Sequence, residues 1–259
     1  MTTAATPIPS APAAPVRRAP PLRERGSIRH DVLRIARWRL KGIAKVVGDV
    51  EVSAGDLDGT LVVGGKLTAG RLRAFGRLEV RGPVTVPGSL RTRGTFRAGG
   101  PVRAGAAFLV GSCDAAGALE VQGELRCRGS LRAPEVRADT IALEGTAEVR
   151  HLVAVRALTA RFSGDARLGQ LEARDVRLRG PVPNLVTEAL GRTYIVSAER
   201  IEAATVYVQA ARVGFVRAPT IVLGRYAHVV EHEGTIARAH PTSRLGPESW
   251  TPPPPGLRR

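Results

Sequence analysis

Large aromatic side chains are scarce in this chain, at 4% of its 259 residues, and there are only two cysteines and one methionine. Globular enzyme cores normally hold more aromatic rings, so a narrow core of Val, Leu and Ala fits this composition better. Two cysteines are too few for a disulfide framework. No apolar run approaches the roughly 20 residues of a membrane-spanning helix, and residues 1–21 lack the apolar segment of a signal peptide. The sequence therefore predicts a soluble protein of a reducing cytoplasm.

Glycine is abundant, with 29 residues, and apolar residues follow a short repeat. After Gly59 the chain reads TLVVGG, KLTAG, RLRAFG, RLEVRG and PVTVPG, so that an apolar residue recurs every five or six positions. A small or β-branched residue usually follows two positions later, and a glycine usually ends the unit. The first apolar residues of successive units are Leu61, Leu67, Leu72, Leu78, Val84, Leu90, Phe96, Val102, Phe108, Cys113, Leu119, Leu125, Leu131, Val136, Ile141, Ala147, Leu152 and Leu158.

Each repeat unit has the length of one short β-strand. Side chains alternate along a strand, so the two apolar residues of a unit point the same way, and the glycine permits a corner. Three units would close one coil of about 17 residues, and because a coil cannot bury its apolar face alone, successive coils must stack with parallel strands. We therefore predict an all-β fold, a three-sided parallel β-helix (β-solenoid), over residues 46–234.

Outward charges support this stacking, because every third unit would lie on the same face. On one face the residues after the apolar position alternate in sign, and we call this set the charge ladder: Glu79, Arg97, Asp114, Arg132 and Glu148. A second face gives Arg103, Glu120 and Arg137. The third face is the most basic, with Arg73, Arg91 and Arg126, and with Leu109 between the last two. Opposite charges on neighbouring strands attract each other, so the ladder predicts a fixed register.

The flanking segments differ from the repeat. Residues 1–27 are rich in Pro and Ala and predict a disordered arm, and residues 235–259, with Pro252–Pro255 in a row, predict a second, Pro-rich disordered tail. Residues 181–193 contain two prolines and predict a loop that interrupts the repeat. Residues 28–45 fit either an amphipathic helix or a β-strand that caps the first coil, and the pattern slightly favours the strand.

Positive charge is concentrated at the ends. Residues 1–45 hold ten Lys and Arg against two Asp and Glu, within a chain of net charge +16. Such a basic arm could bind DNA, a DNA-bound partner or an anionic membrane surface, or could simply keep the protein soluble. Its candidate residues are Arg17, Arg18, Arg23, Arg25, Arg29, Arg34, Arg37, Arg39 and Lys41.

No residue set predicts catalysis. A general base needs an orienting partner and a cleft, and the histidines available are His151, His228, His232 and His240. His228 and His232 lie in a strand pattern, so HVVEH does not present the one-face pair of a zinc helix. Cys113 and Cys127 fall at inward positions, where thiols usually act as small apolar groups. Lys66 follows glycines but without the order of a phosphate-binding loop. We therefore expect no enzyme, cofactor, metal or small-molecule substrate.

Residues 201–234, IEAATVYVQAARVGFVRAPTIVLGRYAHVVEHEG, together with the repeat before them, resemble the bactofilins, a family of polymer-forming bacterial cytoskeletal proteins. The resemblance implies a right-handed, three-sided β-helix with disordered termini. It also implies rods that polymerise end to end without nucleotide and scaffold the machinery of cell shape, polarity or chromosome segregation. Residues 1–27 lack the short apolar and basic membrane-targeting peptide of some members.

An uncapped solenoid exposes backbone edges and apolar residues at both ends, which favours pairing with another copy. We expect this polymer interface to contain Val46, Val50 and Val52 at one end and Phe215, Ile221, Leu223 and Val229 at the other. The predicted function is a structural, self-assembling protein of the bacterial cytoplasm, with protein clients bound through its tails. Alternatives are a non-polymerising adaptor, associated with membrane or nucleoid through its basic arm, and, less favoured, a solenoid acyltransferase.

Overall fold

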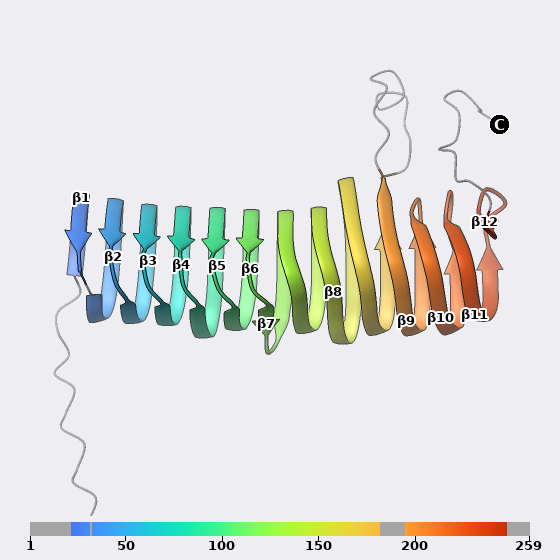
Figure 1. The fold of residues 1–259 in the computed structure, drawn as a ribbon, viewed down its shortest axis with the longest axis horizontal. Coiled ribbons are helices and arrows are strands. Elements are labelled where there is room, and N and C mark those ends of the chain that lie inside the picture. Colours follow the sequence, from blue (N-terminus) through green and yellow to red (C-terminus); the bar gives the residue numbers. More distant parts are fainter. Residues whose placement is uncertain (1–21, 32, 182–194, 248–259) are drawn as a thin grey trace, which may run out of the picture.

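The computed structural model describes residues 22–31, 33–181 and 195–247. Within these residues there is no helix, and the chain forms a parallel β-solenoid of about 12 turns. Figure 1 shows the strands side by side along one rod, in the order in which they occur in the sequence. The strands are β1 (Leu22–His30), β2 (Leu33–Val46), β3 (Val50–Val63), β4 (Leu67–Val80), β5 (Val84–Ala98), β6 (Val102–Ala115), β7 (Leu119–Val121), β8 (Glu124–Arg179), β9 (Val196–Gln209), β10 (Arg212–Leu223), β11 (His228–Ala239) and β12 (Arg244–Leu245).

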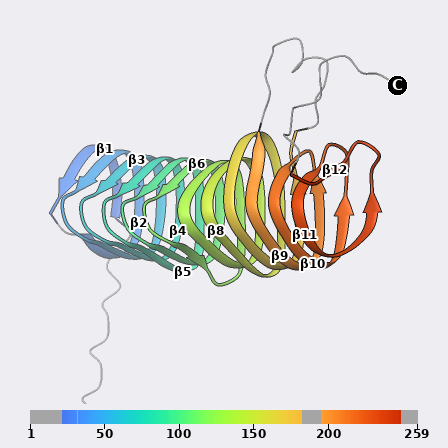
Figure 2. The ribbon, with the colours of Figure 1, turned by 45° about the vertical axis from the view of Figure 1, so that its right-hand side comes forward.

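Strand register gives the length of a coil. Val50 pairs with Leu67, Leu72 pairs with Leu90, and Arg212 pairs with His228. In each case the partner follows at the distance that three units of five or six positions predict. In Figure 2 the coils follow one another face to face along the rod, so each coil covers the apolar interior of the one before it.

The core is one narrow column of Leu, Val, Ile and Ala side chains inside the coils. Every first apolar residue of the repeat units is buried except Phe108, whose predicted inward position is wrong. Ala107 and Leu109 occupy the inward positions instead, with Ala107 stacked between Leu90 and Leu125. Phe108 therefore lies on the outer surface, and it, not Leu109, stands between Arg91 and Arg126 in the third row.

A row of glycines runs along one corner of the rod. Gly42, Gly59, Gly76, Gly94, Gly111, Gly129 and Gly145 all have φ between 110° and 137°. Only glycine adopts this conformation at little cost. The row also brings coils close together, because a Cβ at Gly94 would lie 2.2 Å from the carbonyl oxygen of Gly76. One glycine per coil thus fixes both the turn and the close approach of its neighbour.

Strand structure extends further than the sequence predicts. Residues 33–45 belong to β2, so the helical alternative is wrong and the strand interpretation is confirmed. β1 pairs with β2 from Leu22 onward, which places residues 22–27 in the stack and not in a disordered arm. At the other end, β11 continues to Ala239 and β12 adds Arg244–Leu245, so the stack does not stop at residue 234.

Other predicted segments lie outside the described residues. They are residues 1–21 of the arm, residues 248–259 of the tail and residues 182–194, which include most of the predicted loop. The strands on either side of that loop pair directly, with Ala166 beside Val196. This step along the chain is longer than the usual coil, so the solenoid continues past the interruption without losing its core.

Candidate functional site

The N-terminal end of the rod is formed by β1, which pairs only with β2 in the described chain. The sequence predicts Val46, Val50 and Val52 at this end, but β1 and β2 extend the rod beyond them. Val50 stacks between Leu33 and Leu67 and is fully buried. The predicted place of these three valines in an exposed end is therefore wrong, because residues 22–45 supply further coils.

The C-terminal end shows the same shift by one coil. β11 covers β10, with Glu231 beside Phe215 and Ile236 beside Ile221. Leu223 and Val229 are buried as well, and Val229 is covered by Leu245 of β12. Phe215 is not an inward residue, since its ring lies on the outer surface under the guanidinium groups of Arg200 and Arg217. These four residues are thus not the terminal surface.

The exposed C-terminal end consists of the last coil itself. Its inward positions continue the core column, with His232 above Val216, Ile236 above Ile221 and Ala239 above Leu223. Ile236 is half-buried against the core, whereas His232 and Ala239 are exposed. β12 pairs only with His228 and Val229, so the edge of β11 from Val230 onward has no strand beside it in the described chain.

A buried histidine anchors the short cover at this end. His228 is 1% exposed, and its Nε2 lies 2.9 Å from the carbonyl oxygen of Gly246, a distance at which the ring N–H donates a hydrogen bond. Gly246 N in turn donates to the carbonyl oxygen of Val229 at 3.1 Å. These bonds hold the chain after β11 over the first residues of the last coil and leave the rest of its edge open.

Part of the predicted basic arm belongs to the strands of the rod. Arg17 and Arg18 lie outside the described residues, whereas Arg23, Arg25 and Arg29 are on β1. Arg34, Arg37, Arg39 and Lys41 project from β2 into solvent. Arg34 pairs with Glu51 at 3.6 Å and Arg39 with Asp56 at 4.0 Å, both on β3. The basic segment is therefore a wall of the solenoid from residue 22 onward.

The charge ladder lies in one row across neighbouring strands, with Glu79 beside Arg97, Arg97 beside Asp114, and Asp114 beside Arg132. The row continues to Glu148, whose Oε2 accepts hydrogen bonds from Arg132 Nε at 2.9 Å and Nη2 at 2.5 Å. Glu79 instead pairs along its own strand with Arg77, at 2.6 Å. On the second face, Arg103 pairs with Glu120 at 2.9 Å, and Arg137 lies in register with Glu120.

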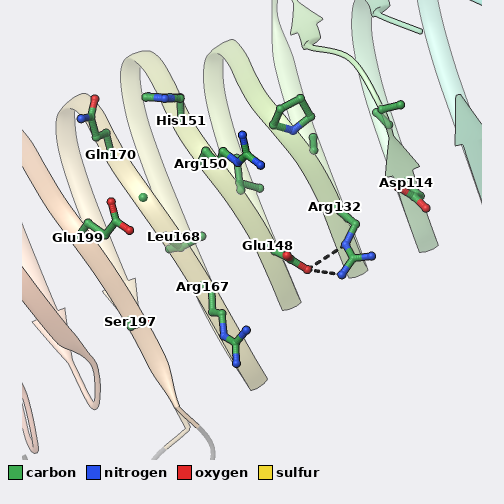
Figure 3. Close-up of a pocket in the computed structure, with 16 residues that line it drawn as sticks. Asp114, Arg132, Glu148, Arg150, His151, Arg167, Leu168, Gln170, Ser197 and Glu199 are labelled. Carbon is green, nitrogen blue, oxygen red and sulfur yellow. Dashed lines mark hydrogen bonds and ion pairs between the residues drawn. The ribbon is translucent and has the colours of Figure 1, made fainter. Parts of the chain in front are cut away.

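A hollow of about 840 Å³ follows this ladder over β6, β8 and β9. In Figure 3 Arg132 and Glu148 point toward each other, while His151, Arg150 and Arg167 lie apart from that pair. His151, the one histidine of this lining, makes no hydrogen bond with another described residue, so no described group orients its imidazole.

The remaining candidate residues are His240, the two cysteines and Lys66. His240 Nδ1 lies 3.0 Å from the hydroxyl of Thr242, and no group of three metal-binding side chains occurs in the described part of the chain. Cys113 and Cys127 are buried and free. Burial raises the pKa of Cys127 to about 12 and raises that of Cys113 further, so both thiols stay protonated at neutral pH. Lys66 pairs with Asp49 at 3.7 Å.

Comparisons with protein-family models, curated proteins and solved structures find no match. Over the described ranges, no helix has the length and apolar character needed to cross a membrane.

Proposed function

We propose that the protein is a structural subunit that assembles end to end into nucleotide-independent filaments or scaffolds. The observation that supports this most is the open strand edge at each end of the rod. β1 has a partner on one side only in the described chain, and β11 is covered by β12 at just two residues. A second copy could continue the ladder of parallel strands at either edge.

Open edges of this kind favour self-association. Strands at the border of a sheet carry unpaired N–H and C=O groups, and natural proteins normally cover them, shorten them or interrupt them. The core column adds an apolar contribution, because Ile236 and Ala239 continue it to the last coil. Stacking another coil there would bury these side chains in the way that each internal coil is already buried.

The resemblance to bactofilins supports the same proposal for the cellular role. A filament of this rod would act as a cytoskeletal scaffold in the bacterial cytoplasm, positioning client proteins for cell shape or chromosome segregation. Residues outside the solenoid would bind those clients. The acyltransferase alternative has less support, because His151 in the large hollow has no orienting partner in the described chain.

Electron microscopy of the full chain without nucleotide tests the proposal, and we expect filaments that also sediment at high speed. Ile236→Arg should abolish them, because it places a charge on the core column at the end of the rod. The matched control is Val155→Arg, at a side position that is 72% exposed on β8. Filaments that persist in Ile236→Arg, or that are lost equally in a folded Val155→Arg protein, would contradict end-to-end stacking.

The adaptor function is a second candidate, favoured by the exposed cations of β2. Arg37 and Lys41 make no ion pair with another described residue. An adaptor would remain monomeric in sedimentation and would bind DNA or anionic vesicles in a strongly salt-dependent way. Arg37→Gln with Lys41→Gln should then weaken that binding, whereas a filament subunit would assemble unchanged.

A further inference from the structure

A hollow of about 400 Å³ lies on the side of the rod over β3, β4 and β5, in the N-terminal part of the rod in Figure 1. Its walls are Arg71, Arg73 and Ser89 with Arg91, and its floor is Leu72 and Gly55. Gly55 occupies an inward position in register with Trp38 and Leu72, where a Cβ would lie 2.9 Å from Leu72 Cδ1.

An irregularity of the strands shapes this hollow. Thr68 pairs with Thr85, but Leu72 pairs with Leu90, so β5 advances one position further than β4 between these two pairs. The corner of β5 before Leu90 therefore holds one residue more than the corresponding corner of β4. The register between β5 and β6 shifts back between Val86 and Ser89. Bulges of this kind redirect side chains and often lie beside binding sites, and this one places Ser89 next to the arginines.

The charges here break the alternation seen elsewhere on the rod. Across neighbouring strands the row runs Arg39, Asp56, Arg73 and Arg91, so Arg73 has a carboxylate beside it on β3 but another arginine beside it on β5. Like charges opposite each other destabilise a sheet. None of Arg71, Arg73 and Arg91 forms an ion pair with another described residue. Asp56 is the one carboxylate in the lining, and it faces Arg39 at 4.0 Å, so positive charge in the hollow remains in excess.

Aromatic rings hold two of these guanidinium groups. Arg73 Cζ lies 4.8 Å from the centre of the Phe75 ring, and Arg91 Cζ lies 5.1 Å from that of Phe108. Stacking on a ring restricts a guanidinium without using its N–H donors. The two rings lie outside the lining of the hollow, and both guanidinium groups keep their N–H donors, which can bind a tetrahedral oxyanion in pairs.

We infer that this hollow is an anion-binding site that takes a phosphate group, bound by Arg71, Arg73 and Arg91 and by the hydroxyl of Ser89. The phosphate can belong to a free phosphate compound or to a lipid headgroup, since the donors recognise the same group in both. This site goes beyond the proposed end-to-end assembly, because it lies on the side of the rod.

Two probes test the inference on the full chain: pyrophosphate in isothermal titration calorimetry, and phosphatidylglycerol vesicles in a flotation assay, which separates vesicle-bound chain from filaments that sediment on their own. We expect the triple variant Arg71→Gln, Arg73→Gln, Arg91→Gln to weaken binding at least about tenfold, because hydrogen bonds to charged groups are lost. The matched control is Arg161→Gln, Arg174→Gln, Arg177→Gln, which removes the same charge from exposed positions of β8 that line no described hollow. It should bind like the native chain.

Asp56→Asn gives a test of opposite sign. It removes the carboxylate of the lining and should tighten binding of both probes. Pyrophosphate binding without vesicle binding would identify a free phosphate compound as the source, and vesicle binding that pyrophosphate displaces would identify the lipid headgroup. Absence of binding to both probes, or equal loss in the two triple variants, would overturn the site. Circular dichroism of each variant checks that the solenoid is intact.

Discussion

The two halves of the rod form their corners differently. In the first half, residues 22–145, a positive-φ glycine stands at the same corner in successive coils from Gly42 to Gly145. In the second half, residues 146–245, the described chain does not continue this row, and positive φ occurs at Ala210 (47°), Tyr226 (57°) and Gly234 (129°). Register shifts occur in both halves, on either side of β5 in the first and between β10 and β11 in the second.

This difference concerns how closely the backbones of neighbouring coils pack at a corner. In the first half each glycine lies against the carbonyl oxygen of the glycine before it, at a distance that excludes any side chain. This contact imposes one corner geometry on every coil. In the second half such contacts do not form a row: a Cβ at Gly180 would lie 1.9 Å from the carbonyl oxygen of Ala210, and one at Gly234 would lie 1.7 Å from that of Ala218. The core column nevertheless continues past residues 182–194.

The largest effect is expected for Gly94→Ala in the first half. The new Cβ would lie 2.2 Å from the Gly76 carbonyl oxygen at a φ of 125°. Strain at positive φ and forced separation of the coils together should cost about 3 kcal/mol or more of the free energy of unfolding. Gly246→Ala is the control, since its φ is 108° but nothing lies within 4 Å. Equal losses in urea denaturation would show that coil contact adds nothing to the φ strain.

A smaller effect is expected from the two thiols, which are both buried in the first half. The pKa of Cys127 is about 12 in the folded chain against 9.0 in the unfolded chain. Above pH 9 the unfolded state therefore loses a proton that the folded state keeps, and stability falls by about 1.4 kcal/mol per pH unit for each such thiol. Urea titrations between pH 8 and 10.5 measure this slope. Cys113→Ala with Cys127→Ala should flatten it, and an unchanged slope would refute the assignment.

Ala210→Gly should stabilise the second half, by about 0.5 kcal/mol, because relief of the left-handed conformation is worth about 1–2 kcal/mol and part of it is offset by the greater freedom of glycine in the unfolded chain. Ala211→Gly is the control, because Ala211 is buried with an ordinary φ and should be destabilised instead. Thermal unfolding of both variants measures the difference, and a loss in Ala210→Gly would show that this corner carries no strain.

The smallest effect is expected for the ion pairs of the two halves. Arg132 and Glu148 are exposed, as are Arg217 and Glu233, so Arg132→Gln should leave the melting temperature nearly unchanged. The hydrogen bond from Arg217 lowers the pKa of Glu233 below its usual 4.5. That pair therefore contributes above pH 4.5 and its contribution is lost as the pH falls, so Arg217→Gln should slightly weaken the acid dependence. A large loss at pH 7 in either variant would contradict this.

Individual residues show which core positions the repeat predicts correctly and which it does not. The inward positions from Leu61 to Leu158 follow from apolar spacing, because side chains alternate along every strand. Phe108 is the exception, since the spacing of AGAAFLVG fits two registers and only stacking of Ala107 on Leu90 and Leu125 selects one. The coils that the repeat predicts to be terminal are internal in the structure. The prediction stops one or more coils short at each end, because β1 and β11 have too few apolar residues to continue the pattern.

The hollow beside Arg71, Arg73 and Arg91 could not be predicted from the repeat. Its arginines come from two coils. The extra residue near Ser89 is recognised as a bulge only from the pairing of β5 with β4 and β6. The glycine row is a similar case, because many units end in glycine but one corner alone requires positive φ throughout. Both features depend on contacts between residues about one coil apart.

The sequence by itself determined the class of fold, the length of the coil and the identity of nearly every core residue. Strand periodicity and glycine corners are local properties, and they repeat often enough in this chain to be recognised without a structure. Only the tertiary structure decided which coils are terminal, which edge stays open and where unlike strands bring three arginines together. Those features arise from pairing across about one coil, and local spacing carries no information about the partner that each strand receives.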